Sequence, residues 1–321
     1  MTRSSRRKFL KISGVAAGMA AASASAWVGF SNSRLARMTR QIAKDTLRNP
    51  APPPVVPTPA RWNDNQVTLT WIGHATVLIN FYGVRILTDP AFSDRVGIDL
   101  GLLTLGPKRY VAPALAFAEL PPVDLVLLSH AHMDHMDLPT LARLKSNQTV
   151  ITARETSEIL QPTRLTNVTE LDWGETKTLR TAKGELRVEA FEVKHWGRRW
   201  PGDKPRGYNG YVLRREGRAL IFGGDTALTP LFRNLRTAGP YAAALMPIGA
   251  YNPWIRNHCT PEEALRMADM AGAEWVAPIH HATFKLSDEP MHEPLERFQT
   301  AIAKERDRLV LKEVGGTATL T

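Results

Sequence analysis

Cysteine is almost absent from this chain of 321 residues, which contains only Cys259. A single thiol excludes an internal disulfide bond and the paired cysteines of a zinc finger. Cys259 also has no histidine at a spacing typical of a catalytic cysteine–histidine pair. We therefore expect Cys259 to be structural or incidental, and the chemistry of the protein must come from other side chains.

Two common functional motifs are missing as well. The sequence contains no G-x-x-x-x-G-K-[ST] loop, which would cradle the phosphates of a nucleotide, and no G-x-S-x-G turn, which would present a nucleophilic serine. No segment repeats at a period of about 20–50 residues. These absences argue against a P-loop nucleotide-binding protein, a serine hydrolase of the common α/β type and a repeat architecture.

Acidic residues are fewer than basic ones, with 31 Asp and Glu against 41 Lys and Arg and a net charge of +10. Residues 1–26 hold 5 of the basic residues and no acidic one, so the rest of the chain carries 36 against 31, or +5. This mild positive charge favours contact with anionic surfaces, phosphates or membranes, but by itself it does not indicate nucleic-acid binding. We expect no nucleic-acid partner, and a membrane-surface contact stays open.

The first 30 residues look like a targeting segment. The stretch S-R-R-K-F-L-K at residues 5–11 resembles the twin-arginine export pattern, and a mildly apolar run rich in alanine continues to residue 30. The small residues 24–26 offer a cleavage site, and the shortage of leucine makes a permanent membrane span the weaker reading. We predict a twin-arginine signal over residues 1–30, the export machinery as a partner and a periplasmic location, with membrane association left open.

Residues 31–60 have the composition of a linker. A basic helical piece at 34–48 is followed by P-A-P-P-P at 50–54 and P-T-P at 57–59. Closely spaced prolines favour extended backbone that packs poorly. We predict a basic and proline-rich linker here, followed by a folded domain over residues 61–321.

Sheet-forming segments outnumber helical ones in residues 61–321. Strands are predicted at 67–71, 77–81, 85–89, 124–129, 149–152, 186–193, 208–214, 219–223, 242–247 and 275–279. Helices are predicted at 139–145, 154–160, 230–237 and 261–271. The last has Thr260 as its N-cap, Pro261 at its first position, Glu263 at the capping-box position and Gly272 as its stop. Because the strands fall in two sets, we predict an α/β fold: an αββα sandwich of two mixed sheets flanked by helices.

Three histidines and an aspartate crowd into the six residues H-A-H-M-D-H at 130–135, directly after the apolar run 123–128. Neutral imidazoles and carboxylates suit zinc and similar divalent ions. The first two histidines can face one ion, and the following Asp-His pair can serve a second ion nearby. A polar loop with incidental histidines is the alternative, and the clustering of three of the nine histidines argues against it.

Further metal ligands follow other predicted strands. His195 comes after the alternating segment 186–193, and Asp225 follows the apolar run 219–222 and two glycines that allow close backbone approach. His280 and His281 follow 275–279. Taken singly, each could be a turn or core residue. Taken together, they favour a metal site built from four strand ends.

These motifs resemble those of the metallo-β-lactamase fold hydrolases. The flanking segments are more similar still to the N-acylphosphatidylethanolamine-hydrolysing phospholipase D group and its bacterial relatives. The resembling segments are W-I-G-H-A-T (71–76), L-T-D-P (87–90), G-P-K-R-Y (106–110), D-L-V-L-L-S-H (124–130), H-W (195–196), G-D-T (224–226), P-I-G-A-Y (247–251), P-E-E-A (261–264) and I-H-H-A-T-F (279–284). The resemblance covers about residues 61–298. The H-x-H-x-D-H motif alone indicates only the superfamily, and the flanking segments narrow the resemblance to the phospholipase D group.

The resemblance implies two divalent metal ions, with zinc expected. One ion would be held by His130, His132 and His195, the other by Asp134, His135 and His280, and Asp225 would bridge the two. His280 is preferred over His281 because it occupies the first position of the family's H-x-x-T-F segment. His258 resembles a substrate-side histidine and is expected, with Asp134, to be catalytic. A plain loop histidine stays open for His258. For His74 two roles stay open, a hydrogen bond near the site and a buried structural role.

The expected reaction is hydrolysis by a hydroxide that bridges the two metal ions, because coordination lowers the pKa of water from about 15.7 toward about 7. Asp134 would orient this nucleophile and could accept its proton. We predict a phospholipase D-like phosphodiesterase acting on N-acylphosphatidylethanolamine-like lipids.

Three alternatives remain. A lactonase or another acyl hydrolase would fit the same metals, and a non-catalytic metal-binding periplasmic protein could keep the ligands. An RNA-processing nuclease uses H-x-H-x-D-H too, but the export signal would separate it from its substrate.

Aromatic residues are expected to crowd the mouth of the site, although core packing would explain each of them as well. They are Trp196, Trp200, Tyr251, Trp254 and Phe284.

Overall fold

The computed structural model describes residues 45, 48–99 and 104–320. Contacts divide the chain into two units, Met1–Arg48 and Asn49–Thr321. The predicted signal at 1–30 lies outside the described residues, as does the predicted helix at 34–48 apart from Asp45 and Arg48. Among the described helices, none has the length and apolar character needed to cross a membrane.

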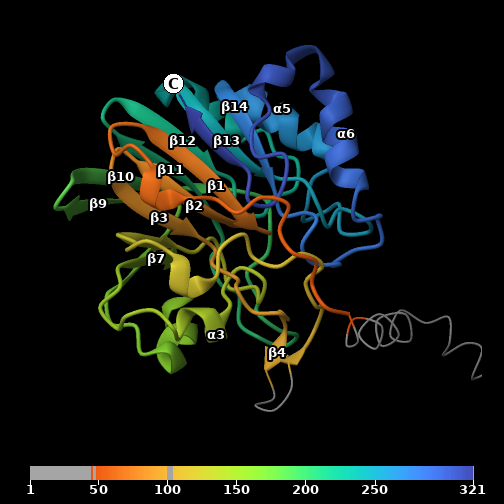
Figure 1. The fold of residues 1–321 in the computed structure, drawn as a ribbon. Coiled ribbons are helices and arrows are strands. Elements are labelled where there is room, and N and C mark those ends of the chain that lie inside the picture. Colours follow the sequence, from red (N-terminus) through yellow and green to blue (C-terminus); the bar gives the residue numbers. More distant parts are fainter. Residues whose placement is uncertain (1–44, 46–47, 100–103, 321) are drawn as a thin grey trace, which may run out of the picture. The chain divides into compact units, whose positions relative to one another are not determined.

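A seven-stranded sheet forms one half of the second unit, with the strand order β15-β1-β2-β3-β6-β7-β8 (Figure 1). Neighbours from β15 to β3 pair antiparallel, and those from β3 to β8 pair parallel. Its strands are β1 (Val67–Gly73), β2 (Thr76–Phe81), β3 (Val84–Thr88), β6 (Leu125–Leu127), β7 (Val150–Ala153), β8 (Val168–Leu171) and β15 (Thr317–Leu320).

A six-stranded sheet forms the other half, in the order β14-β13-β12-β11-β10-β9. Strands β9 to β12 pair antiparallel, and β12, β13 and β14 pair parallel. Its strands are β9 (Thr176–Thr181), β10 (Gly184–Glu192), β11 (Asn209–Arg215), β12 (Arg218–Phe222), β13 (Tyr241–Pro247) and β14 (Ala273–Ile279). A short ribbon of β4 (Ile98–Asp99) and β5 (Thr104–Leu105) stands apart.

Helices cover the outer faces of both sheets. Helices α5 and α6 lie beside β13 and β14, and α3 lies on the side of β7 (Figure 1). The α-helices are α3 (Leu138–Leu141), α4 (Phe232–Leu235), α5 (Pro261–Ala271) and α6 (Glu293–Ala301). The 3₁₀ helices are η1 (Pro59–Arg61), η2 (Phe117–Glu119), η3 (Ser157–Thr163), η4 (Arg236–Ala238) and η5 (Ala303–Arg308).

Three apolar clusters establish the order of the layers. The largest joins side chains of both sheets, such as Leu127 and Phe222, and so lies between them. A second packs β12 and β13 against α5 and α6, through residues such as Met267 and Phe298. The third packs β6 and β7 against α3 and η3. Burial of apolar surface on both faces of each sheet is the expected driving force, and the predicted αββα sandwich is confirmed.

Local sequence signals explain which elements were predicted. Helix α5 has the predicted bounds, because the Thr260 and Glu263 side chains each accept the other's backbone N–H and Gly272 ends the helix at φ +77°. The helix predicted at 154–160 is instead the 3₁₀ helix η3, which contains Pro162. The helix predicted at 139–145 shortens to α3, and that at 230–237 divides into α4 and η4.

Several elements carry no clear sequence signal and were not predicted. Strand β9, T-K-T-L-R-T, exposes most of its side chains, so it lacks the alternation of a half-buried strand. Strands β8 and β15 and helix α6 were missed as well. The proline-rich stretch does contact the folded unit, because Ala51 N donates to Tyr110 O and Ala51 O accepts from Ala112 N, both at 2.8 Å.

Candidate metal centre

The ends of β6, β10, β12 and β14 bring all seven predicted ligands into one cluster. Two groups of side chains each place their donor atoms within 4.8 Å of one another. The first consists of His130, His132, His195 and Asp225, and the second of His74, Asp134, His135 and His280. The loop after β6 meets the second sheet through a bridge between His130 and Tyr208, which explains how residues of both sheets share one site.

In the first group, three ring nitrogens face one another. His132 Nδ1 lies 2.8 Å from His130 Nε2 and 3.2 Å from His195 Nε2. The His195 Nδ1–H donates to Asn257 O at 2.7 Å, which leaves the Nε2 lone pair directed into the cluster. Burial holds the pKa of both His130 and His195 well below the usual range. These rings are therefore neutral near pH 7, the form in which histidine ligates a metal.

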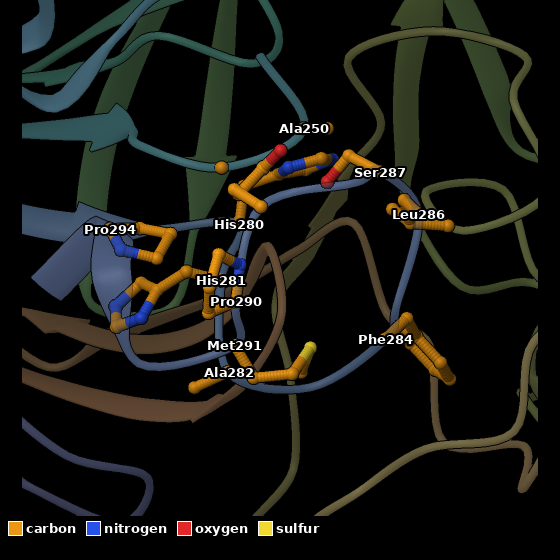
Figure 2. A pocket seen from close by; sticks show the side chains of 12 residues that line it. Ala250, His280, His281, Ala282, Phe284, Leu286, Ser287, Pro290, Met291 and Pro294 are labelled. Carbon is orange, nitrogen blue, oxygen red and sulfur yellow. The ribbon is translucent and has the colours of Figure 1, made fainter. Parts of the chain in front are cut away.

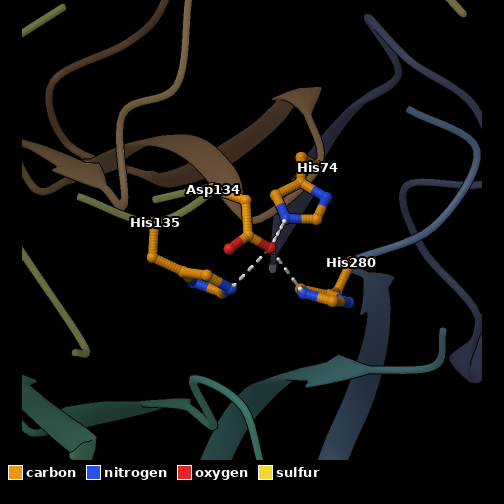
Figure 3. A group of neighbouring side chains, drawn as sticks. All are labelled: His74, Asp134, His135 and His280. Carbon is orange, nitrogen blue, oxygen red and sulfur yellow. Dashed lines mark hydrogen bonds and ion pairs between the residues drawn. The ribbon is translucent and has the colours of Figure 1, made fainter. Parts of the chain in front are cut away.

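In the second group, three rings converge on one oxygen of Asp134 (Figure 3). Asp134 Oδ2 lies 2.9 Å from His74 Nε2 and 3.4 Å from the Nε2 atoms of both His135 and His280. Asp134 is half-buried, whereas the histidines around it are buried. The carboxylate therefore stands at the open side of the group.

Asp225 faces both groups. Its Oδ2 lies 3.2 Å from His135 Nε2 and from His280 Nε2, and 3.8 and 4.0 Å from the Nε2 atoms of His195 and His130. A single carboxylate oxygen thus stands between the two sets of nitrogen donors, in the position that a bridging ligand requires.

Gly224 explains why the chain can place Asp225 there. It has a φ of +57°, and a Cβ atom at this position would lie 2.7 Å from Asn209 O and 2.9 Å from Ser129 Cβ. Only glycine combines this backbone conformation with so close an approach of three segments. The sequence analysis interpreted the two glycines before Asp225 as positions that allow close backbone approach. In the structure, Gly224 has this role.

The histidines set the charge of both carboxylates. Burial alone would raise the pKa of Asp134 and Asp225, but the adjoining rings outweigh it and hold both pKa values well below the usual range. Conversely, burial alone would lower the pKa of His280, but Asp225 and Asp134 raise it to about 9. The two carboxylates therefore favour positive charge between them, which a divalent cation supplies in place of protons.

Asp89 orients the second group, and the sequence analysis gave it no role. Its Oδ2 accepts from His135 Nδ1 at 2.6 Å and from Ser129 Oγ at 2.6 Å, and its Oδ1 accepts from Ser129 N at 2.7 Å. The His135 ring is thereby turned so that Nε2 faces the cluster, as metal-ligating histidines commonly require. The signal was present, because Asp89 follows an apolar strand as Asp225 does.

His74, whose role the sequence left open, contacts a predicted ligand. Burial lowers its pKa to about 3, so the ring is neutral and its Nε2–H donates to Asp134 Oδ2. A nitrogen that carries hydrogen cannot ligate a metal ion, so in this arrangement His74 orients Asp134. The backbone is fixed as well, since His74 N donates to Thr283 Oγ1 at 2.7 Å and His280 N donates to His74 O at 2.9 Å.

The two remaining histidines of the region lie differently. His258 Nδ1 is 3.7 Å from Asp225 Oδ2, and the ring is partly exposed at the edge of the cluster. His281 turns away and stacks on Trp71, with 4.5 Å between ring centroids. His280 and His281 also line a small cavity of about 20 Å³ with the segment 282–294 (Figure 2), which is too small for a substrate.

Unsatisfied polar atoms test whether these residues fit a metal. In the described part of the chain, six buried atoms of the two groups make no hydrogen bond: His74 Nδ1, His132 Nε2, His135 Nε2, Asp225 Oδ1 and both ring nitrogens of His280. Each buried polar atom left unpaired costs about 1–3 kcal/mol. Metal ligation would satisfy the two that face the carboxylates, His135 Nε2 and His280 Nε2, so the residues present fit divalent ions of the zinc class.

Several proteins of known sequence are similar to this chain over two thirds or more of its length. The chain is 31% identical over 278 residues to an uncharacterized protein of Mycobacterium tuberculosis, covering 82% of this chain and 72% of that protein. It is 30% identical to N-acyl-phosphatidylethanolamine-hydrolyzing phospholipase D 1 of Caenorhabditis elegans (68% and 64% covered). It is 31% identical to the mitochondrial N-acyl-phosphatidylethanolamine-hydrolyzing phospholipase D of Saccharomyces cerevisiae (82% and 58%). The chain thus spans less than two thirds of the length of either phospholipase.

Solved structures agree in fold. An isothiocyanate hydrolase from Delia radicum gut bacteria is 19% identical with a TM-score of 0.63, covering 79% of this chain and 99% of that one. A metallo hydrolase from Ignicoccus hospitalis is 21% identical with a TM-score of 0.59, covering 80% and 99%. The model of the Beta-lactamase superfamily domain matches residues 84–281, more than half of the chain. The chain therefore belongs to the β-lactamase superfamily and is a metal-dependent hydrolase of the metallo-β-lactamase fold.

Proposed function

We propose that this protein is a phosphodiesterase of phospholipase D type that hydrolyses N-acylphosphatidylethanolamine-like phospholipids. The observation that carries the proposal is the position of Asp225 Oδ2, which faces two separate sets of histidine donors. Such a pair of sites suits a phosphodiester, because two metal ions can stabilise both the attacking and the leaving oxygen. The names of the two phospholipase relatives support the choice of lipid.

The ligand assignment follows the two groups. His130, His132 and His195 would hold one zinc ion, Asp134, His135 and His280 would hold the other, and Asp225 would contact both. When bound, such a pair of ions supplies an activated water and stabilises charge on the phosphoryl oxygens. Everything else in the reaction falls to the side chains of this protein.

Asp134 and His258 are the two residues that we assign to catalysis. Because His74, His135 and His280 all approach Asp134 through Oδ2, Oδ1 is the atom that would orient the attacking water and accept its proton. Burial lowers the pKa of His258 to about 4, so its ring is neutral near pH 7. With Nδ1 on the side of Asp225, Nε2 would face the substrate and could hydrogen-bond a phosphoryl oxygen.

We further propose that residues 1–30 direct export by the twin-arginine route to the periplasm. The support is the sequence S-R-R-K-F-L-K at residues 5–11 and the alanine-rich run that follows it. This route carries folded proteins, which suits an enzyme that binds its metal ions before export.

The test is turnover of defined lipids by the zinc-loaded full chain. We expect release of phosphatidic acid from dispersed N-acylphosphatidylethanolamine, lost in Asp225→Ala and kept in Asp307→Ala, which removes an exposed carboxylate far along the chain. A zinc-loaded protein that opens a lactone but leaves the phospholipid intact would replace this proposal by the lactonase alternative. Turnover of neither substrate nor bis(p-nitrophenyl) phosphate would favour a non-catalytic metal-binding protein.

A further inference from the structure

Large apolar side chains that reach solvent gather beside the metal centre. In the described chain, nine such residues are exposed, and five of them lie on three segments next to the site. These five, called here the apolar rim, are Ile98 (48% exposed), Trp196 (47%), Trp200 (44%), Trp254 (45%) and Ile255 (45%). Exposed apolar groups that cluster at one place commonly mark a surface for a partner or a membrane.

Two of the segments meet at His195. The Trp196 ring packs against the His132 ring, with 4.7 Å between centroids. In the other segment, Trp254 O accepts from His258 N at 3.0 Å, and Asn257 O accepts from His195 Nδ1 at 2.7 Å. The loop that carries Trp196 and the loop that carries Trp254 and Ile255 are therefore joined at the edge of the metal centre.

A cavity connects the third segment to the same edge. Ile98 and Trp200 line a cavity of about 460 Å³ together with Met133, the residue between His132 and Asp134 in the sequence. The apolar rim thus extends from β4 past the half-buried side of the metal centre to the loop before α5.

Two of the three segments of the rim carry charge of one sign. The segments W-G-R-R-W at 196–200 and W-I-R-N-H at 254–258 contain no acidic residue. Arg198 and Arg256 are exposed. Arg199 instead turns inward, where Nη1 donates to Ala131 O at 2.6 Å and to Met136 O at 3.0 Å and so fixes the loop of the candidate ligands. Exposed tryptophan beside exposed arginine suits the boundary between water and an anionic bilayer.

We infer that the apolar rim docks this protein on a bilayer surface that contains anionic phospholipids, with the metal centre facing the headgroups. The inference rests on the proposed function in so far as the substrate is a membrane lipid. Tryptophan and isoleucine would enter the headgroup region, and Arg198 and Arg256 would contact lipid phosphates. A phosphodiester in the bilayer could then reach Asp134 and His258 without leaving the lipid phase.

The experiment measures binding of the full chain to vesicles of phosphatidylcholine with and without phosphatidylglycerol, none of which contains an N-acylated lipid. We expect Trp254→Ser with Ile255→Ser to weaken binding to the anionic vesicles by about tenfold or more, because two large apolar side chains no longer leave water. The matched control is Val55→Ser with Val56→Ser, an adjacent pair of exposed apolar residues off the rim, which should bind like the wild type.

Charge is tested separately. Arg198→Gln with Arg256→Gln should weaken binding to phosphatidylglycerol vesicles by about fivefold for each arginine and leave binding to pure phosphatidylcholine unchanged. Residues 1–48 are the same in all variants, so differences report the rim alone.

Three results would overturn the docking inference: a wild type that shows no preference for the anionic vesicles, a rim double variant that binds as tightly as the wild type, or a valine control that loses as much. A wild type that binds as expected but releases no phosphatidic acid from N-acylphosphatidylethanolamine would contradict the proposed reaction and support the docking surface. The two failures are thus distinguishable.

Discussion

At the scale of single residues, the candidate ligands depend on partners that hold no metal themselves. Asp89 fixes the His135 ring through Nδ1, and His74 occupies Oδ2 of Asp134. The sequence predicted the seven candidate ligands from their residue types and their positions at strand ends, and the structure brings these side chains together. The sequence left the role of His74 open and gave Asp89 none, although Asp89 follows an apolar strand, because their contacts with His135 and Asp134 join segments that are distant in sequence.

Asp89→Asn removes the charged acceptor of the His135 ring, and we expect metal affinity to fall by about 10–100-fold. The matched control is Asp137→Asn. Asp137 is equally buried in the same region, but its carboxylate accepts from Thr140 Oγ1 and Ser93 N and contacts no candidate ligand. The control should lose stability in thermal unfolding and keep its metal. Equal loss of metal from both variants in a chelator competition would refute the role of Asp89.

Asp134→Asn tests the carboxylate that we assign to catalysis. The amide keeps the shape of the side chain but cannot accept a proton, and general-base assistance is typically worth about 10²–10⁴-fold in rate. Turnover should be measured with zinc in excess on the substrate that the lipid screen yields. Activity near that of the wild type would show the proposed role of Asp134 to be wrong even with both metal ions in place.

At the scale of elements, the fold was predictable where burial leaves a pattern. Strands β6, β12 and β14, which deliver ligands, contain apolar runs, and β10 shows the alternation of a half-buried strand. Helix α5 carries its capping box in the sequence. Strands β9 (T-K-T-L-R-T) and β15 (T-A-T-L) could not be predicted, because most of their side chains are not buried and the strands are held by pairing with β10 and β1 rather than by a pattern of their own.

Gly224→Ala tests how β12 delivers Asp225. Gly217 in the turn between β11 and β12 is the matched control, because it also has a positive φ of +71° but has open space around an added Cβ. Left-handed backbone costs a non-glycine residue about 1–2 kcal/mol, so Gly217→Ala should lose about that much stability in urea unfolding. Gly224→Ala should lose more and should also release metal, since its Cβ would displace the Asp225 segment. Equal stability and equal metal content in the two variants would contradict this explanation.

At the scale of the whole molecule, a basic amino-terminal segment precedes a hydrolase unit whose exposed apolar residues gather at one side of its site. Of this arrangement, the sequence alone predicted the segment, the sandwich and the ligands. It also placed five aromatic residues at the mouth of the site but could not tell which of them reach solvent, because a tryptophan in the core and one at the surface look alike in a sequence. Trp196, Trp200 and Trp254 are exposed, whereas Tyr251 and Phe284 are buried. The predicted export route and the docking surface would both place the enzyme where phospholipids are found.

Arg6→Lys with Arg7→Lys keeps the charge of the amino terminus but removes the paired guanidinium groups of the export pattern. We expect the protein to accumulate in the cytoplasm in folded form. Lys8→Arg, which leaves the pair intact, is the control and should be exported normally. An unchanged periplasmic yield of the double lysine variant after cell fractionation would refute the twin-arginine route.

The metal content of the folded protein tests the central claim most directly, namely that two donor groups share Asp225. Elemental analysis of the wild type loaded with zinc and freed of excess should give about two ions per chain. Asp225→Ala should lose more metal than His74→Ala, because Asp225 faces both groups and His74 orients a ligand of one. One ion or none in a fully loaded, folded wild type would contradict the binuclear centre.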